Sequence, residues 1–235
     1  MPSVTKWLIS KCLAALRLVN SLLPFQLSIK RPRKTPLDMP RYVYQEQYNR
    51  FEIPDRAVVI DIGSGNYQFP RATILCDYSI DPAVRDRSAI VRDERPLVIC
   101  DICNLPFRDK SADYIYCSHV LEHIEDPLKA CSELQRVAKA GYIETPNFMK
   151  DVLFSWAQDM HKWHTVAINN ELHFFEYTHR QAEGIRSKIW HEMILSRVYH
   201  KMQDVFWDNQ DLFNTMFSWQ DNFTCVVHRL DTSSN

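Results

Sequence analysis

Four side chains that can exchange protons lie close together in two short runs of the sequence. His119, Glu122 and His123 fall within SHVLEHIEDP, and Glu144 falls within GYIETPN. Histidine titrates near neutral pH, and a nearby carboxylate can orient the ring or accept a proton. We therefore treat all four as candidate catalytic residues, with His119 or His123 as the general base. Helix capping or a buried hydrogen bond is the alternative role for Glu122 and His123.

A second group of residues could hold a nucleotide-like ligand. The run AVVIDIGSGN contains Asp61, Gly63 and Gly65. The two glycines are half of the four glycines in the chain. This run predicts a short strand followed by a tight turn. Glycines there permit backbone conformations closed to other residues and let a ligand approach the chain. Two glycines alone do not identify the ligand, so the surrounding pattern decides.

The pattern of an apolar strand ending in a polar residue recurs along the chain. ATILCD ends at Asp77, PLVICD ends at Asp101, ADYIYCSH ends at Ser118 and His119, and AGYIETP carries Glu144. Between the last two, DPLKACSELQRVAKA predicts a helix with one apolar face, made of Leu128, Cys131, Leu134 and Val137.

Alternating strands and helices predict a Rossmann-like α/β fold, with a mostly parallel sheet and helices on both faces. Ligands of such sheets bind outside the carboxyl ends of the strands. The polar residues that end the predicted strands should therefore meet at one edge of the sheet.

Taken in order, these runs resemble the class I methyltransferases. DIGSG, the acid after the second strand, Asp101 to Phe107 (D-x-x-x-LPF), SHVLEHIEDP and RVAKAGYIETPN are together similar to the type 11 methyltransferase group over roughly residues 55–148. GSGNYQFPRATILCD and GYIETPN are similar to bacterial members encoded beside glycosyltransferases. The resemblance implies S-adenosylmethionine as cofactor and methyl transfer to a small molecule, a saccharide or a glycolipid. A lipid or quinone acceptor would suit the amphipathic N-terminal arm equally well.

The resemblance also implies roles for the residues of the turn. Asp61, Gly63 and Gly65 would shape the pocket for the methionine part of the cofactor, and Asp77 would accept hydrogen bonds from both ribose hydroxyls. The chain departs from the family at Tyr67, where many relatives have a third glycine. A proline three residues later means that any helix after the turn is short.

The later strands supply the remaining cofactor residues that the resemblance implies. Asp101 would accept a hydrogen bond from the adenine amino group, with the backbone of Ile102 nearby. Ser118 and His119 would border the methionine and the transferred methyl group.

Other functions fit parts of the same sequence. A dinucleotide oxidoreductase requires G-x-G-x-x-G, but Gln68 occupies the third glycine position. His119 to His123 spell H-x-x-E-H, the signature of inverted zinc peptidases, in which Glu122 would activate a zinc-bound water. That motif directly follows a strand of the nucleotide-binding series, which a peptidase leaves unexplained, so we expect no metal. A cofactor-binding module without turnover stays open, because fold does not guarantee activity.

Composition limits the compartment and the partners. The seven cysteines are an odd number and no secretory signal precedes them, which favours reduced thiols and a cytoplasmic protein. Cys100 and Cys103 form the one close pair, and without a second such pair we expect them to be structural. Residues 1–37 hold seven basic residues and no acidic one, so the rest is acidic on balance. An acidic body argues against a nucleic-acid groove.

We divide the chain into a basic arm, residues 1–40, and a methyltransferase domain, residues 41–235. The domain comprises a cofactor-binding core at 55–148, a cap or acceptor region at 149–222 and a closing strand at 223–230. The cap is rich in aromatic residues, which at these spacings more often form a core than a stacking surface.

Three runs of the C-terminal part predict secondary structure. HTVAINNELHFFEY predicts a hairpin that turns at Asn169 and Asn170, EGIRSKIWHEMI a helix, and NFTCVVHRL the closing strand. His161 and His164 could join the site or be exposed.

The basic arm predicts an amphipathic helix from Val4 to Leu23, ended by Pro24. Lys11 and Arg17 interrupt its apolar residues, so it should not cross a bilayer. The run KRPRK after it could lie against anionic lipid headgroups. Packing on the body, contact with a partner, or a role as a transit peptide are the alternatives.

If the arm binds membranes peripherally, the full chain should float with anionic liposomes, while a chain that starts near Arg41 should stay at the bottom of the gradient. The physical reason is that the basic residues and the apolar helix face are then both missing. Equal and slight flotation of the two proteins would exclude membrane binding.

Overall fold

The computed structural model describes residues 41–81, 90, 93–154, 161–177 and 201–230. Residues 1–34 and 35–235 form separate units. The amphipathic helix expected at 4–23 and the helix expected at 183–194 lie outside the described residues. The division into arm, core and cap stays a prediction.

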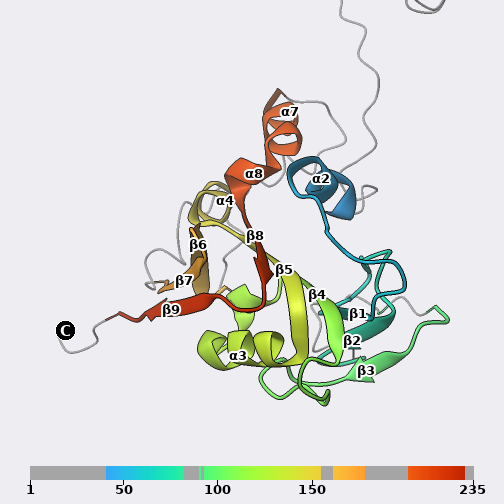
Figure 1. Ribbon diagram of the computed structural model, residues 1–235. Coiled ribbons are helices and arrows are strands. Elements are labelled where there is room, and N and C mark those ends of the chain that lie inside the picture. The colour runs from blue at the N-terminus through green and yellow to red at the C-terminus, as the bar shows by residue number, and fades with distance from the viewer. Residues whose placement is uncertain (1–40, 82–89, 91–92, 155–160, 178–200, 231–235) are drawn as a thin grey trace, which may run out of the picture. The chain divides into compact units, whose positions relative to one another are not determined.

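A six-stranded sheet forms the centre of the domain, with the order β3-β2-β1-β4-β5-β8 (Figure 1). The first five are parallel to their neighbours, and β8 runs antiparallel to β5. This arrangement confirms the predicted mostly parallel, Rossmann-like α/β fold. The strands are β1 (Val59–Ile62), β2 (Ile74–Asp77), β3 (Leu97–Ile99), β4 (Ala112–Ser118), β5 (Ala138–Pro146) and β8 (Asn214–Gln220).

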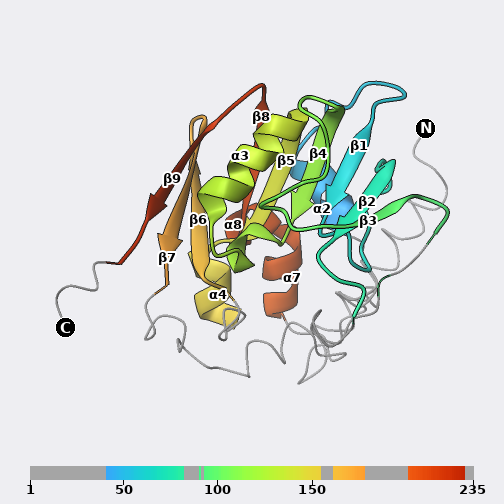
Figure 2. The ribbon, with the colours of Figure 1, turned by 90° about the horizontal axis from the view of Figure 1, so that it is seen from below.

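Helices cover both faces of this sheet, as expected. In Figures 1 and 2, α3 lies over one face, while α2 and α8 lie on the opposite side. Among the described residues, the α-helices are α2 (Arg41–Tyr48), α3 (Pro127–Val137), α4 (Phe148–Phe154), α7 (Lys201–Asp208) and α8 (Gln210–Phe213).

Helix α3 forms where the sequence predicts it. Its N-cap, Asp126, accepts a hydrogen bond from the Lys129 amide at 3.0 Å, and Pro127 occupies the first helical position. The helix buries Cys131, Leu134 and Val137 as expected, but Leu128 is half exposed. The neighbouring Pro127 and Ala130 are buried in its place.

The two faces of the sheet bury different side chains. Along β4, Ile115 and Cys117 join the larger, mainly aliphatic cluster that includes α3, whereas Tyr114 and Tyr116 join a cluster on the other face. The second cluster is aromatic: the rings of Phe69 and Tyr116 stack at 4.4 Å between centroids. Tyr116 and Tyr142 also stack, at 5.7 Å between centroids, so the rings form a contiguous aromatic layer on this face of the sheet.

A second sheet, of three strands in the order β6-β7-β9, lies beside the first. β6 (Trp163–Ile168) and β7 (Glu171–Glu176) form the predicted hairpin, and Asn169 in its turn has a φ of 54°. β9 (Thr224–His228) lies where we expected the closing strand, but it pairs with β7. β8 instead forms the edge of the main sheet.

The pairing of β8 with β5 depends on a glycine. Trp219 lies opposite Gly141, and a Cβ added at Gly141 would lie 2.6 Å from the Ile115 carbonyl oxygen and 2.8 Å from the Trp219 indole nitrogen. Only glycine leaves room for the indole against the sheet.

None of the helices in the described part has the length and apolar character that crossing a bilayer requires.

Candidate functional site

The register of the parallel strands brings the predicted site residues to one edge. Ile62, just before the glycine turn, lies opposite Cys76 of β2 and Cys117 of β4, and Ser118 lies opposite Glu144 of β5. Asp77 ends β2 opposite Ile99, two residues before Asp101. The expected grouping at the carboxyl edge is therefore present.

The glycine turn is held by hydrogen bonds to β2. The amides of Gly63 and Ser64 both donate to the Cys76 carbonyl, at 2.9 and 3.0 Å. Gly63 and Gly65 have φ values of 71° and 51°, which residues other than glycine rarely adopt. A Cβ on Gly63 would also lie 2.3 Å from a methyl carbon of Val120. The turn therefore needs glycine for conformation and for space.

Asp77 joins the glycine turn directly. One of its carboxylate oxygens accepts the Gly65 amide at 3.0 Å and the other accepts the Tyr78 amide at 2.9 Å. Each carboxylate oxygen has a second lone pair, so the same group can still accept hydroxyl hydrogen bonds. Its position is thus set by the backbone of the turn.

Asp101 and Ile102 lie in the turn that follows β3. The Asp101 carboxylate is exposed and accepts the Cys103 amide at 2.8 Å. The Ile102 side chain packs into the aliphatic core, which anchors its backbone. This arrangement leaves the carboxylate at the surface of the edge, where an amino group could reach it.

Asp61 faces inward. It is buried, and its carboxylate accepts the Phe69 amide at 2.8 Å, which closes the segment between β1 and β2 in place of the expected short helix. Burial raises the pKa of Asp61 to about 7, against the opposing effects of the Phe69 amide, Arg95 and Arg41. Arg95 supports the same segment by donating to the carbonyls of Phe69 and Ala72.

Helix α2 lies against this edge, and the sequence analysis did not anticipate it. Gln45 donates to the Ser118 hydroxyl at 3.3 Å and accepts from the Tyr116 hydroxyl at 2.7 Å, and Arg41 donates to the Ser118 carbonyl at 3.2 Å. The signal in the sequence was the spacing of Arg41, Tyr44 and Gln45, which lie on one helical face.

Glu144 is the most densely bonded carboxylate of the site. Although fully buried, it accepts hydrogen bonds from the hydroxyls of Tyr44 and Tyr142, both at 2.5 Å. The Nε2 atom of His119 lies 3.1 Å from the same oxygen that Tyr44 contacts. Buried carboxylates need such donors, because burial of an unpaired charge is costly.

His119 is held in a strained position at the end of β4. Its φ is 59°, and its amide donates to the Glu144 carbonyl at 2.7 Å. A non-glycine residue in this region costs about 1–3 kcal/mol and persists where the surroundings enforce it. Burial, together with Arg41 and Lys150, holds the pKa of His119 well below its usual value despite the Glu122 carboxylate nearby. A neutral ring is the form that can accept a proton.

Glu122 and His123 belong to a single 3-10 turn, η2 (Leu121–His123), rather than to a helix. The H-x-x-E-H motif therefore does not present its two histidines one helical turn apart. Glu122 is 1% exposed, with its Oε1 atom 3.3 Å from the His119 Nδ1. Burial opposes its ionisation, yet its pKa is lowered overall by His119, His123 and His161.

A further set of buried polar residues extends the site beyond β5. In α4, Lys150 donates to Asn214 at 2.7 Å, and burial lowers its pKa to about 8. Asp151 accepts from His161 at 2.9 Å and from the Tyr177 hydroxyl at 2.8 Å. His161 therefore belongs to this buried polar set.

His164 packs its ring among the aromatic side chains beside this set, with Phe148, Phe175 and Tyr177 at 5.1–5.2 Å between ring centroids. It is thus part of an aromatic cluster rather than an isolated surface residue.

Comparison with known protein families identifies the central segment. Residues 60–143 match a family model described as a methyltransferase domain, of the type 11 group. The matched segment runs from β1 into β5. The match implies S-adenosylmethionine as its cofactor. No curated protein matches the chain.

Several solved structures are similar to this chain. One is a protein described as a methyltransferase of an antibiotic biosynthesis pathway in Anabaena variabilis, with 21% identity, a TM-score of 0.37 and coverage of 46% of each chain. Another is YcgJ from Bacillus subtilis, with 20% identity, a TM-score of 0.36 and coverage of 47% of this chain and 56% of that one. The chain spans about half the length of these two structures.

A third similar structure covers more of this chain. It is a chain of the complex between the Haloferax volcanii Trm112 methyltransferase activator and a protein described as a methyltransferase. The identity is 13%, the TM-score is 0.47, and the coverage is 76% of this chain and 88% of that one.

The residues of the methyltransferase domain fit the cofactor. Gly63 packs so closely against Val120 that the turn excludes any Cβ there, and the Asp77 carboxylate is anchored to the same turn through the Gly65 amide. A turn of residues without side chains and a fixed carboxylate suit the binding of an amino acid and a ribose diol.

The buried Asp61 predicts a measurable pH dependence of stability. Because its pKa rises from 3.8 unfolded to about 7 folded, the folded state binds more protons between these values, and the free energy of unfolding falls as pH rises. The Asp61→Asn variant has no titrating group at this position, so its stability lacks this dependence on pH. The difference in unfolding free energy, variant minus wild type, should grow by up to about 4 kcal/mol between pH 4 and 8.

Urea unfolding of both cofactor-free proteins at several pH values would measure this difference. Any constant offset from the buried amide drops out, because only the slope against pH is compared. A difference that does not change with pH would contradict the inward, protonated Asp61.

Proposed function

We propose that the protein transfers a methyl group from S-adenosylmethionine to an oxygen of a small molecule. The observation that carries this proposal is the meeting of the glycine turn and Asp77 with His119 at one edge of the sheet. The glycine turn and Asp77 suit the binding of a cofactor, and His119 suits the removal of a proton from an acceptor.

The cofactor residues act by positioning. Gly63 and Gly65 would place the backbone against the methionine part, Asp77 would accept the ribose hydroxyls, and Asp101 would accept the adenine amino group. When bound, the cofactor supplies a methyl group on a sulfonium, which leaves by in-line attack. The chain therefore has to align the acceptor and keep water away.

His119 is the base in this proposal. Its neutral ring takes the proton of the acceptor hydroxyl, and the nearby carboxylates of Glu144 and Glu122 stabilise the resulting charge. The left-handed backbone and the Glu144 carbonyl fix the ring in place. His123, being more exposed, and Glu122 are the other candidates from the sequence.

We propose a saccharide or glycolipid as the acceptor class, and we do not expect nucleic acid. The aromatic cluster of Phe148, His164, Phe175 and Tyr177 supports this choice, since aromatic faces stack on sugar rings. Peripheral contact of residues 4–34 with a membrane would bring such an acceptor close.

Isothermal titration with S-adenosylmethionine and S-adenosylhomocysteine tests the cofactor site. The wild type should bind both, and Asp77→Ala should weaken binding by about 10- to 100-fold, because a charged acceptor of hydrogen bonds is lost. Asp113→Ala, at the opposite end of β4, is the control and should bind like the wild type. Absence of wild-type binding would refute the proposed cofactor site.

The role of His119 is tested once saccharides and glycolipids have been screened for methyl incorporation. His119→Gln should lower kcat by about 10²- to 10⁴-fold, because the proton acceptor is lost. The dissociation constant for S-adenosylmethionine should change little, and His173→Gln in the small sheet should behave like the wild type. Unaltered turnover would exclude His119 as the base, and no incorporation with any acceptor would favour a binding module.

A further inference from the structure

Three potential metal ligands converge beyond the end of β4. A carboxylate oxygen of Glu122 and one ring nitrogen from each of His123 and His161 all lie within 4.8 Å of one another. We propose that these three residues bind a divalent first-row transition-metal ion, for which Zn²⁺ is the simplest probe. The metal-site proposal does not rest on the proposed methyl transfer, although Glu122 takes part in both.

The donor set fits this class of ion. Two imidazoles and one carboxylate form the protein ligands of several catalytic zinc sites, which keep a further position open. Mg²⁺ and Ca²⁺ prefer oxygen ligands and would be poorly served by two nitrogens. The proposed ion is therefore a nitrogen-preferring one.

Glu122 provides an observation that points to a missing cation. Its side chain is 1% exposed, and neither of its oxygens has a hydrogen-bond partner among the described residues. The nearest groups are ring nitrogens of His119 and His123, at 3.3 and 3.8 Å. These two ring nitrogens lie at ion-pair distance and make no hydrogen bond of normal geometry to Glu122, so a bound cation would satisfy a buried carboxylate that is only partly paired.

His161 is oriented as a metal ligand normally is. Its Nδ1 atom contacts the Asp151 carboxylate at 2.9 Å, which leaves Nε2 with its lone pair available. Histidines that bind metals usually donate their other ring N–H to a carboxylate or carbonyl, which fixes the tautomer and the ring. Asp151 is itself buried and is held by the Tyr177 hydroxyl.

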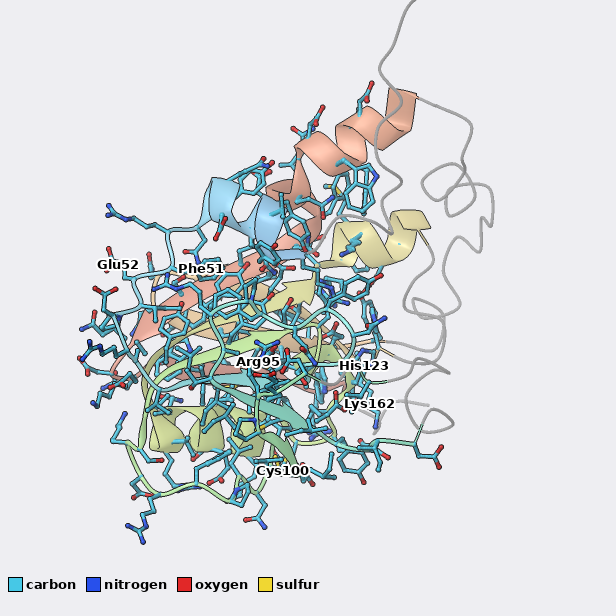
Figure 3. The ribbon with its side chains drawn as sticks, turned by 90° about the vertical axis from the view of Figure 1, so that its right-hand side faces the viewer. Phe51, Glu52, Arg95, Cys100, His123 and Lys162 are labelled. Carbon is cyan, nitrogen blue, oxygen red and sulfur yellow. The ribbon has the colours of Figure 1, made fainter. Side chains whose placement is uncertain are left out.

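The backbone holds the two halves of the site together. The Lys162 amide donates to the Glu122 carbonyl at 2.7 Å, and the Trp163 indole donates to the Ile124 carbonyl at 2.6 Å. Figure 3 shows His123 and Lys162 close together on one side of the domain. These bonds place His161 next to η2 although the residues are far apart in the sequence.

Metal binding requires a small rearrangement. Ligands about 2.1 Å from a tetrahedral ion lie about 3.4 Å apart, so the three donor atoms must approach one another. His123 is 38% exposed and its ring lies 4.8 Å from that of His161, so its side chain has room to turn inward.

This set differs from the one that H-x-x-E-H suggests. There the two motif histidines bind the metal and Glu122 serves as base, whereas here Glu122 is itself a ligand and His161 replaces His119. Because Glu122 lies between the ion and His119, the metal would border the acceptor region and could bind an acceptor oxygen. This last role alone rests on the proposed function.

Zinc titration of the full chain, after treatment with a chelator, tests the site without any cofactor. One Zn²⁺ per chain should bind, and Mg²⁺ at the same concentration should not compete. His161→Ala should weaken Zn²⁺ binding at least 100-fold, and Asp151→Asn about 10- to 100-fold, as loss of an orienting carboxylate does. Circular dichroism would show that the variants are folded.

His173→Ala provides the matched control, because His173 and His228 form a separate histidine pair in the small sheet. This variant should keep wild-type affinity. Undiminished binding by folded His161→Ala, or loss of binding in His173→Ala, would overturn the proposal.

Co²⁺ substitution gives a test that needs no variant. The wild type should develop visible absorption of a four- or five-coordinate ion without a thiolate charge-transfer band, because no cysteine is a ligand. Spectra of an octahedral aqueous ion, or a strong thiolate band, would also refute the site.

Discussion

The buried carboxylate of Glu144 is the constraint on which the rest of the site depends. It joins three elements: α2 through Tyr44, β5 through Tyr142 and the end of β4 through His119. Each hydrogen bond to a buried charge is worth about 1.5–3 kcal/mol, and loss of any donor would leave part of the charge unsatisfied. The helix before the sheet and the strands at its centre are thereby held in one arrangement.

This constraint explains why His119 can remain in a left-handed conformation. Its amide and its ring both contact Glu144, so relaxation of the backbone would break two interactions at a buried charge. The same position turns the other ring nitrogen towards Glu122. The left-handed backbone of His119 and the buried carboxylate of Glu122 thus belong to one local arrangement. Strained backbone of this kind is typical of functional sites.

Much of the fold could be predicted from the sequence, because its signals are local. The glycine turn, the hairpin at Asn169 and the N-cap of α3 depend on backbone preferences that a few neighbouring residues set. Leu128 and β9 were placed less well. Leu128 has the right helical spacing, but it lies in the first turn of α3 and its side chain is not packed against the sheet. The pairing of an edge strand such as β9 depends on which neighbouring strand is available, and the local sequence does not specify it.

The order of residues in the sequence by itself determined that acids and glycines would meet at one edge, since parallel strands align their carboxyl ends. It also singled out His119, Glu122, His123 and Glu144. Only the tertiary structure decided their partners. Tyr44 lies 100 residues from Glu144, and His161 lies next to η2 through a backbone bond that no spacing reveals. Hydrogen bonds and burial act through space, so the charge state and surroundings of these groups follow from packing rather than from local sequence.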